Sequence, residues 1–217
     1  DIHFGSLGNF SLLTGKSKTK KTFFTSILSA SFLNRNIYTL ETFKSAVEKD
    51  KNNLIYFDTE QGVYDSFQVL KRIFLLSGLS EEEFEDRMQF YCLREYTPNE
   101  RLLFIEKILE QSKDFGLVVI DGITDLISSV NDEEQATMIS SNLLKWSSIY
   151  ECHITTILHQ NKGDNNPKGH LGSYLTQKAE LVLEMSKESE NISAMKITHS
   201  RRLAPEEPFY FAIDDYG

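Results

Sequence analysis

The sequence contains few of the residues that cross-link or interrupt a chain. Among 217 residues there are 2 cysteines, 4 prolines and 1 tryptophan. Cys92 and Cys152 lack the spacing of a metal-binding set, so we expect buried, reduced thiols in a cytoplasmic protein, with a disulfide as the alternative. The composition is 40% hydrophobic and 12% aromatic, which is ordinary for a globular domain that buries a large core.

Long apolar runs and an excess of positive charge are also absent. No apolar segment approaches the roughly 20 residues that a membrane-spanning helix needs, and the N-terminus does not resemble a signal peptide. We therefore expect no membrane partner. Because the first residue is Asp1, we expect residues 1–217 to be a single domain excised from a longer chain. The net charge of −9 argues against a surface that coats nucleic acid, although a local basic loop stays possible.

Apolar segments typical of strands alternate with segments of helical periodicity. The predicted strands are residues 9–15, 52–60, 89–93, 117–121 and 153–160. The predicted helices are residues 22–34, 62–78, 80–88, 97–116 and 133–151. Residues 173–185 are mixed, and the last two predicted strands, which could pair as a hairpin, are residues 192–200 and 208–214. The alternation predicts an α/β fold in which helices flank a mostly parallel central sheet with antiparallel strands at its C-terminal edge.

Residues 15–22 have the spacing of a phosphate-binding loop, G-x-x-x-x-G-K-[ST], with Lys20 in place of the second glycine. Such a loop wraps backbone N–H groups around phosphates before a helix, and it supplies a lysine and an Mg²⁺-binding hydroxyl. Lys21 and Thr22 meet these requirements, so we predict ATP and Mg²⁺ as cofactors. Lys20 costs about 1 kcal/mol if its φ is positive and little if its φ is negative. The alternative is a solvated turn rich in lysine and threonine.

Acidic residues close two of the predicted strands. Asp121 follows four aliphatic residues, and acids at the carboxyl ends of parallel strands face the ligand crevice, so we predict that Asp121 and Thr22 hold Mg²⁺. Asp58 and Glu60 close another strand, where period-two alternation would place both on one face. We expect Glu60 to guide the attacking water and Asp58 to be structural. The alternative for both is a polar strand cap.

Six segments in this order resemble the RecA-like ATPases, and among them most closely the DnaB-type and RepA-type hexameric replicative helicases, which include ATPases of plasmids and mobile elements. The segments read GKSKTKKT, YFDTE, LVVIDGITDL, ILHQNK, NNPKGHLGSYLTQKAELVLEM and MKITHSRRLAPEEPFYFAID. The resemblance covers nearly the whole chain, from about Phe4 to Asp214. It implies that the predicted nucleotide-binding residues are Gly15, Lys16, Ser17, Lys18, Thr19, Lys20, Lys21, Thr22, Phe23 and Asp121.

The resemblance also implies catalytic roles. Gln160 matches a γ-phosphate sensor, whereas the neighbouring His159 is more often a simple hydrogen-bonded residue. Lys196 and Arg201 lie where the family has groups that reach the nucleotide of the neighbouring subunit, with Arg202 as a competitor and ordinary salt bridges as the alternative. Their spacing is wider than the family's usual lysine-x-arginine pair. The predicted catalytic residues are Glu60, Lys21, Gln160, Lys196 and Arg201.

A basic loop at residues 162–171 matches the DNA-facing loop of the family. Lys162, Lys168 and His170 are its predicted DNA contacts, and a polar loop without function is the alternative. The resemblance therefore implies a ring-shaped homo-oligomer, a hexamer, that hydrolyses ATP and acts on single-stranded DNA in replication or mobilisation of a mobile element. The alternative is a regulatory or loader protein with little turnover. A small-molecule kinase would need a lid rich in arginine, which the sequence lacks.

Overall fold

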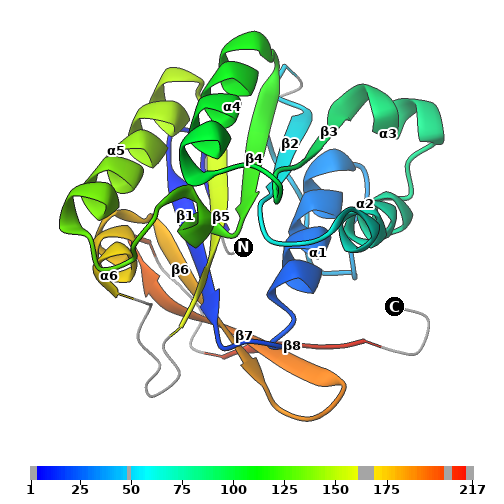
Figure 1. Cartoon of the computed structure of the whole chain (residues 1–217). Coiled ribbons are helices and arrows are strands. Elements are labelled where there is room, and N and C mark those ends of the chain that lie inside the picture. Colours follow the sequence, from blue (N-terminus) through cyan, green and yellow to red (C-terminus); the bar gives the residue numbers. More distant parts are fainter. Residues whose placement is uncertain (1–3, 48–49, 161–168, 203–206, 214–217) are drawn as a thin grey trace. The chain divides into compact units, whose positions relative to one another are not determined.

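The computed structural model describes residues 4–47, 50–160, 169–202 and 207–213. The chain divides into two compact units, one of Asp1–Lys21 with Ile127–Gly217 and one of Thr22–Leu126. Its elements (Figure 1) are β1 (Phe10–Gly15), α1 (Lys21–Leu33), β2 (Asn53–Asp58), α2 (Val63–Ser77), α3 (Glu81–Arg87), β3 (Met88–Cys92), α4 (Pro98–Gln111), β4 (Phe115–Asp121), the 3-10 helix η1 (Ile123–Leu126), α5 (Glu133–Ile149), β5 (His153–His159), α6 (Gly169–Lys178), β6 (Leu181–Lys187), β7 (Ile192–Ser200) and β8 (Phe209–Ala212).

The unit of residues 22–126 contains three parallel strands in the order β3-β2-β4. The register places Asp58, the last residue of β2, opposite both Cys92 and Asp121. Because parallel strands end at the same edge, Asp58 and Asp121 lie side by side at the carboxyl end of this sheet. This is the edge at which open α/β sheets bind their ligands.

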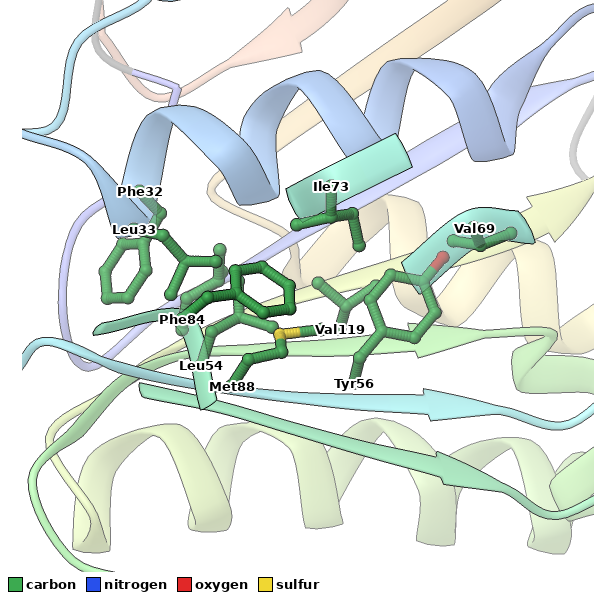
Figure 2. Close-up of a cluster of buried hydrophobic side chains, with 10 residues drawn as sticks. Phe32, Leu33, Leu54, Tyr56, Val69, Ile73, Phe84, Met88 and Val119 are labelled. Carbon is green, nitrogen blue, oxygen red and sulfur yellow. The ribbon is translucent and has the colours of Figure 1, made fainter. Parts of the chain in front are cut away.

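One face of these strands is covered by α1, α2 and α3. The cluster in Figure 2 consists of buried side chains from all six elements, namely Phe32, Leu33, Leu54, Tyr56, Val69, Ile73, Phe84, Met88, Leu117 and Val119. Each fully buried aromatic or aliphatic side chain stabilises the fold by roughly 1.5–3 kcal/mol. The alternate residues face the other side, where Tyr91 of β3 packs edge-to-face on Phe104 of α4 with ring centroids 5.3 Å apart.

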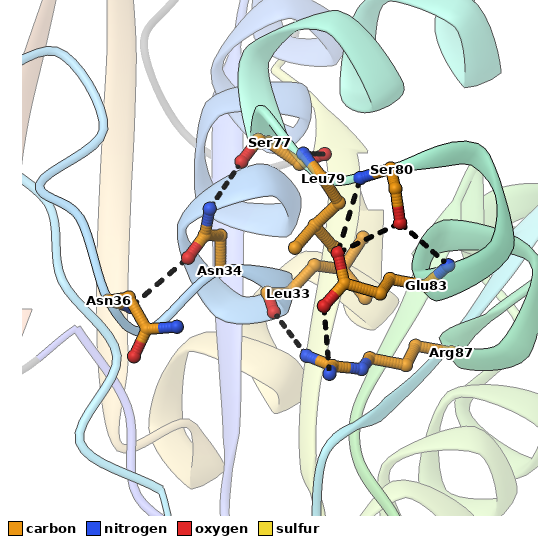
Figure 3. A network of polar contacts seen from close by, with 8 residues as sticks. All are labelled: Leu33, Asn34, Asn36, Ser77, Leu79, Ser80, Glu83 and Arg87. Carbon is orange, nitrogen blue, oxygen red and sulfur yellow. Dashed lines mark hydrogen bonds and ion pairs between the residues drawn. The ribbon is translucent and has the colours of Figure 1, made fainter.

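A polar network fixes the C-terminal end of α1 (Figure 3). The Asn34 side chain donates to the Ser77 carbonyl over 2.7 Å, and Arg87 donates to the Leu33 carbonyl over 3.3 Å. Ser80 and Glu83 form the predicted capping box that starts α3. Since carbonyls at a helix end have no partner within the helix, these bonds satisfy groups that burial would otherwise leave unpaired.

The other unit contains five strands in the order β5-β1-β6-β7-β8. Strand β1 is parallel to both β5 and β6, whereas β6, β7 and β8 are successively antiparallel. The predicted C-terminal hairpin and the predicted mostly parallel sheet with antiparallel edge strands are thereby confirmed. Within the described residues, no helix has the length and apolar character needed to cross a membrane.

Three expectations from the sequence were wrong in detail. The helix predicted to end at Gly116 ends at Gln111, because Ser112 is already extended and Gly116 belongs to the buried strand β4. The mixed segment 173–185 separates into the end of α6 and the start of β6. Both cysteines are free, but only Cys152 is buried, since Cys92 is exposed at the end of β3.

Candidate nucleotide-binding site

The loop after β1 is closed by its own lysine. The Lys21 side chain is 6% exposed, and its Nζ donates to the carbonyls of Gly15 (3.0 Å) and Lys16 (2.7 Å). At Gly15 a Cβ atom would lie 2.6 Å from the Met185 carbonyl and 2.7 Å from Thr19 Oγ1, so this position accommodates only glycine. The loop thus has the tight first turn and the inward lysine that phosphate binding requires.

Lys20 has a left-handed backbone. Its φ is +66°, and Lys18 has a φ of +65°. The sequence left the sign of φ open at position 20, and the structure gives the sign that strains a residue with a side chain. This loop is therefore formed by a lysine in a conformation that glycine adopts without strain.

Gln160 lies beside the start of this loop. Its backbone N–H donates to the Gly15 carbonyl over 3.2 Å, so one oxygen accepts from both Gln160 and Lys21. Its side-chain Nε2 donates to Glu184 Oε1 on β6 over 2.9 Å. The predicted sensor residue is thus held in place through both its backbone and its side chain.

Asp121 is a buried acid that receives two hydroxyl donors. Thr22 Oγ1 lies 3.1 Å and Tyr56 Oη 2.9 Å from Asp121 Oδ2. Burial, followed by the nearby charge of Asp58, raises the pKa of Asp121 from 3.8 to about 7, although the two hydroxyl donors lower it and the Glu60 charge raises it further. The structure thus brings together Thr22 and Asp121, the two residues that the sequence predicted as Mg²⁺ ligands.

Asp58 organises the turn that follows β2. Its Oδ1 accepts from the backbone N–H groups of Glu60 (3.1 Å) and Gln61 (2.9 Å), while its Oδ2 accepts from the Gln61 side chain and from Ser66 of α2. Glu60 is exposed and lies beyond the last strand residue, so the predicted period-two alternation of these two acids does not extend to it. The bonds of Asp58 hold the backbone of Glu60 in this turn.

Thr59 joins this turn to the end of β4. Its Oγ1 lies 2.9 Å from the Asp121 carbonyl and 2.8 Å from the Gly122 carbonyl. Gly122 has a φ of +104°, and a Cβ atom there would collide with Thr59. The two strand ends are therefore fixed side by side, with the carboxylates of Asp58 and Asp121 at the same edge.

These groups fit a magnesium nucleotide. Hydroxyl and carboxylate oxygens are the ligands that Mg²⁺ prefers, and it usually keeps one or two protein ligands and completes its shell with phosphate and water. Thr22 and Asp121 offer such a pair, because the distance between their oxygens is 3.1 Å. Thr22 directly follows Lys21 in the chain, so the lysine and the hydroxyl open the same helix, α1.

The proposed groups for a neighbouring subunit lie on and after β7. Lys196 is exposed in the middle of the strand. Arg201 follows the strand, and its guanidinium donates to the Lys178 carbonyl over 2.9 Å. Arg202 lies 3.5 Å from the buried Glu180 carboxylate, which matches the salt-bridge alternative. Lys196 and Arg201 therefore differ in setting as well as in position.

Of the predicted DNA contacts, only His170 can be placed. It is exposed in the first turn of α6, which begins at Gly169. The final residues of the predicted loop are therefore helical. Lys162 and Lys168 lie outside the described residues.

Comparison with known proteins identifies the family. Residues 4–165 match the family described as AAA domain. The chain belongs to this family. A comparison with curated proteins finds no match. The fold of this AAA domain is similar to the solved structure of the ATPase domain of a DnaB-like helicase, with a TM-score of 0.65 and 15% identity over 96% of this chain and 82% of that chain. The expected RecA-like P-loop ATPase fold is thereby confirmed, and the chain is an ATPase domain of this type.

Three residues of the site were not identified from the sequence. Tyr56 looks like an ordinary strand aromatic, although it shares its face with Asp58 two residues later. Thr59 lies in a turn, where hydroxyl residues are common. Glu184 gave the clearest available signal, since it is a charged residue between the buried Leu183 and Met185.

Proposed function

We propose that this AAA domain binds and hydrolyses ATP and works as a motor on single-stranded DNA. The observation that carries the proposal is the contact of the Thr22 hydroxyl with the Asp121 carboxylate, 3.1 Å apart, directly after the inward-pointing Lys21. A lysine, a hydroxyl and a buried acid are the three groups that a phosphate loop needs for a magnesium triphosphate.

In the proposed reaction the chain's own residues position and stabilise charge. Lys21 exchanges its bonds with the Gly15 and Lys16 carbonyls for phosphate oxygens. Glu60, held by the turn that Asp58 organises, orients the attacking water and accepts its proton. Gln160 donates from its amide to the γ-phosphate.

Thr22 and Asp121 would hold Mg²⁺, which when bound neutralises charge on the phosphate oxygens. In the nucleotide-free chain the high pKa of Asp121 reflects its burial beside other acids. A nearby cation favours the ionised carboxylate, so Asp121 suits a site that is charged only when it is filled.

We further propose that copies of the chain assemble into a ring, a hexamer, so that Lys196 and either Arg201 or Arg202 reach the nucleotide of the neighbouring copy. The exposure of Lys196 on β7 supports this role. Lys162, Lys168 and His170 would contact DNA phosphates. A cytoplasmic location and a role in replication or mobilisation of a mobile element remain predictions.

A second candidate function is an ATP-dependent regulatory or loader protein with little turnover. The positive φ of Lys20 favours it, because a strained side chain in the phosphate loop can slow the rearrangement that hydrolysis needs. The two candidates share the binding site and differ in turnover and in its response to DNA.

ATP hydrolysis with and without single-stranded DNA separates the two candidates. We expect Mg²⁺-dependent hydrolysis that single-stranded DNA stimulates, and a loss of at least about 100-fold in Glu60→Gln, since general-base assistance contributes 10²–10⁴-fold. Glu95→Gln is the matched control, because Glu95 is also exposed and lies after the adjacent strand β3.

The motor proposal fails if ATP binds but DNA leaves its hydrolysis unchanged in preparations in which a ring has formed. Equal activity of Glu60→Gln and Glu95→Gln would remove Glu60 from its role. ATP binding with negligible turnover would favour the regulatory protein.

A further inference from the structure

Glu184 places a carboxylate where strands usually carry apolar side chains. It lies on β6 between the buried Leu183 and Met185, and it is itself half-buried. Strand β6 is paired with β1, which leads into the phosphate loop, and with β7. A charge at such a position costs free energy unless it has hydrogen-bond partners.

The partner of this carboxylate is the Gln160 amide, whose Nε2 donates to Glu184 Oε1 over 2.9 Å. An ionised carboxylate only accepts hydrogen bonds, whereas the two ends of a glutamine amide differ in that one donates and the other accepts. Glu184 therefore selects the orientation in which the NH₂ end faces it. The NH₂ group carries two hydrogens, so donation to Glu184 leaves a second N–H for another acceptor.

The backbone of Gln160 is fixed at the same time. Its N–H donates to the Gly15 carbonyl, which also accepts from Lys21 Nζ. The amide is therefore held beside the first residue of the phosphate loop. Lys196 is the cross-strand partner of Glu184 on β7, and opposite charges in that position favour each other.

We propose that Glu184 is a positioning residue for triphosphate recognition: it orients the Gln160 amide as a donor, so that the site prefers a nucleoside triphosphate over a diphosphate. This inference rests on the proposed function of the nucleotide site. Glu184 itself does not touch the nucleotide. It acts through Gln160, and the γ-phosphate is the group whose recognition depends on it.

The test is the ratio of two affinities measured on the whole chain. Binding of ADP and of the non-hydrolysable imido analogue of ATP, both with Mg²⁺, is measured by calorimetry for wild type, Glu184→Ala and Glu184→Gln. The matched control is Glu188→Gln, because Glu188 is an exposed carboxylate one residue beyond the end of β6 that accepts from Ser186. Gln160→Ala and the double variant Gln160→Ala/Glu184→Ala complete the set.

We expect Glu184→Ala to lower the preference for the triphosphate about tenfold and to leave ADP affinity unchanged, because hydrogen bonds to charged groups are among the stronger ones. Glu184→Gln retains part of the preference, since a glutamine can still accept from Gln160. Glu188→Gln behaves as wild type. The double variant loses no more than Gln160→Ala alone, because Glu184 acts through Gln160.

The inference is overturned if Glu184→Ala weakens both nucleotides equally, which marks a purely structural role, or if it weakens neither. It is also overturned if the effects of the two single variants add. If Glu184→Ala does not fold, Glu184→Gln decides, and an unchanged preference there contradicts the inference. A wild-type chain that binds neither nucleotide would contradict the proposed function and this inference with it.

Discussion

Lys20 holds a left-handed backbone at the position where phosphate loops carry glycine. Its φ of +66° costs roughly 1–2 kcal/mol for a residue with a Cβ atom. Glycine adopts the same conformation without this strain, although it loses more entropy on folding. The loop therefore stores strain next to the residues that we propose bind phosphate.

Lys20→Gly is expected to stabilise the chain by about 1 kcal/mol, because the relief of strain exceeds the added entropy cost of glycine. For a chain of this size the melting temperature rises by about 2–4 °C. Lys16→Gly is the control: the φ of Lys16 is not positive, so glycine there lowers the melting temperature. A lower melting temperature for Lys20→Gly would show that the lysine is not strained.

Asp121 makes stability depend on pH. Its pKa is about 7 in the folded chain and about 3.8 when unfolded, so the folded state binds the proton more tightly. This stabilising contribution is complete below the unfolded pKa and is lost as pH rises through about 7. Asp121→Asn removes the dependence.

Urea unfolding without nucleotide or Mg²⁺ at pH 5 and pH 8 measures this effect. We expect Asp121→Asn to be more stable than wild type, and by about 2 kcal/mol more at pH 8 than at pH 5. Asp65→Asn, which removes an exposed carboxylate on α2, serves as the control. A gain that is equal at both pH values would mean that Asp121 titrates normally.

Strand ends explain how much of the site could be read from the sequence. The strand that stops at Asp121 was predictable, because four aliphatic residues precede the acid. The turn at Glu60 was not, because it depends on Asp58 accepting from two backbone N–H groups and from Ser66, a residue of the next helix. Alternation describes a strand only up to its last residue, and Glu60 lies beyond that point.

Helix boundaries followed the same division. The capping boxes at Ser80 and Thr97 are local patterns, and both form. The end of α4 at Gln111 was missed, because Gly116 looks like a helix stop in sequence while its place in β4 is decided by the neighbouring strand β2. Glu184 was missed for a related reason, since its partner Gln160 is 24 residues away.

At the level of the whole molecule, family and fold extend over different parts of the chain. The AAA domain match ends at residue 165, whereas the fold is similar to the ATPase domain of the DnaB-like helicase over 96% of the chain. Strands β6, β7 and β8, with Glu184 and Lys196, lie beyond the family match. We therefore expect features particular to this chain in its C-terminal strands, and general nucleotide chemistry in the rest.

The central claim is that the loop of residues 15–22 binds a magnesium nucleotide, and calorimetric titration with ATP tests it most directly. We predict binding to wild type that depends on Mg²⁺, at least tenfold weaker binding to Lys21→Ala, and unchanged binding to Lys145→Ala, which removes an exposed lysine on α5. Binding that is equal in all three proteins, or absent from folded wild type with Mg²⁺ present, would contradict the account.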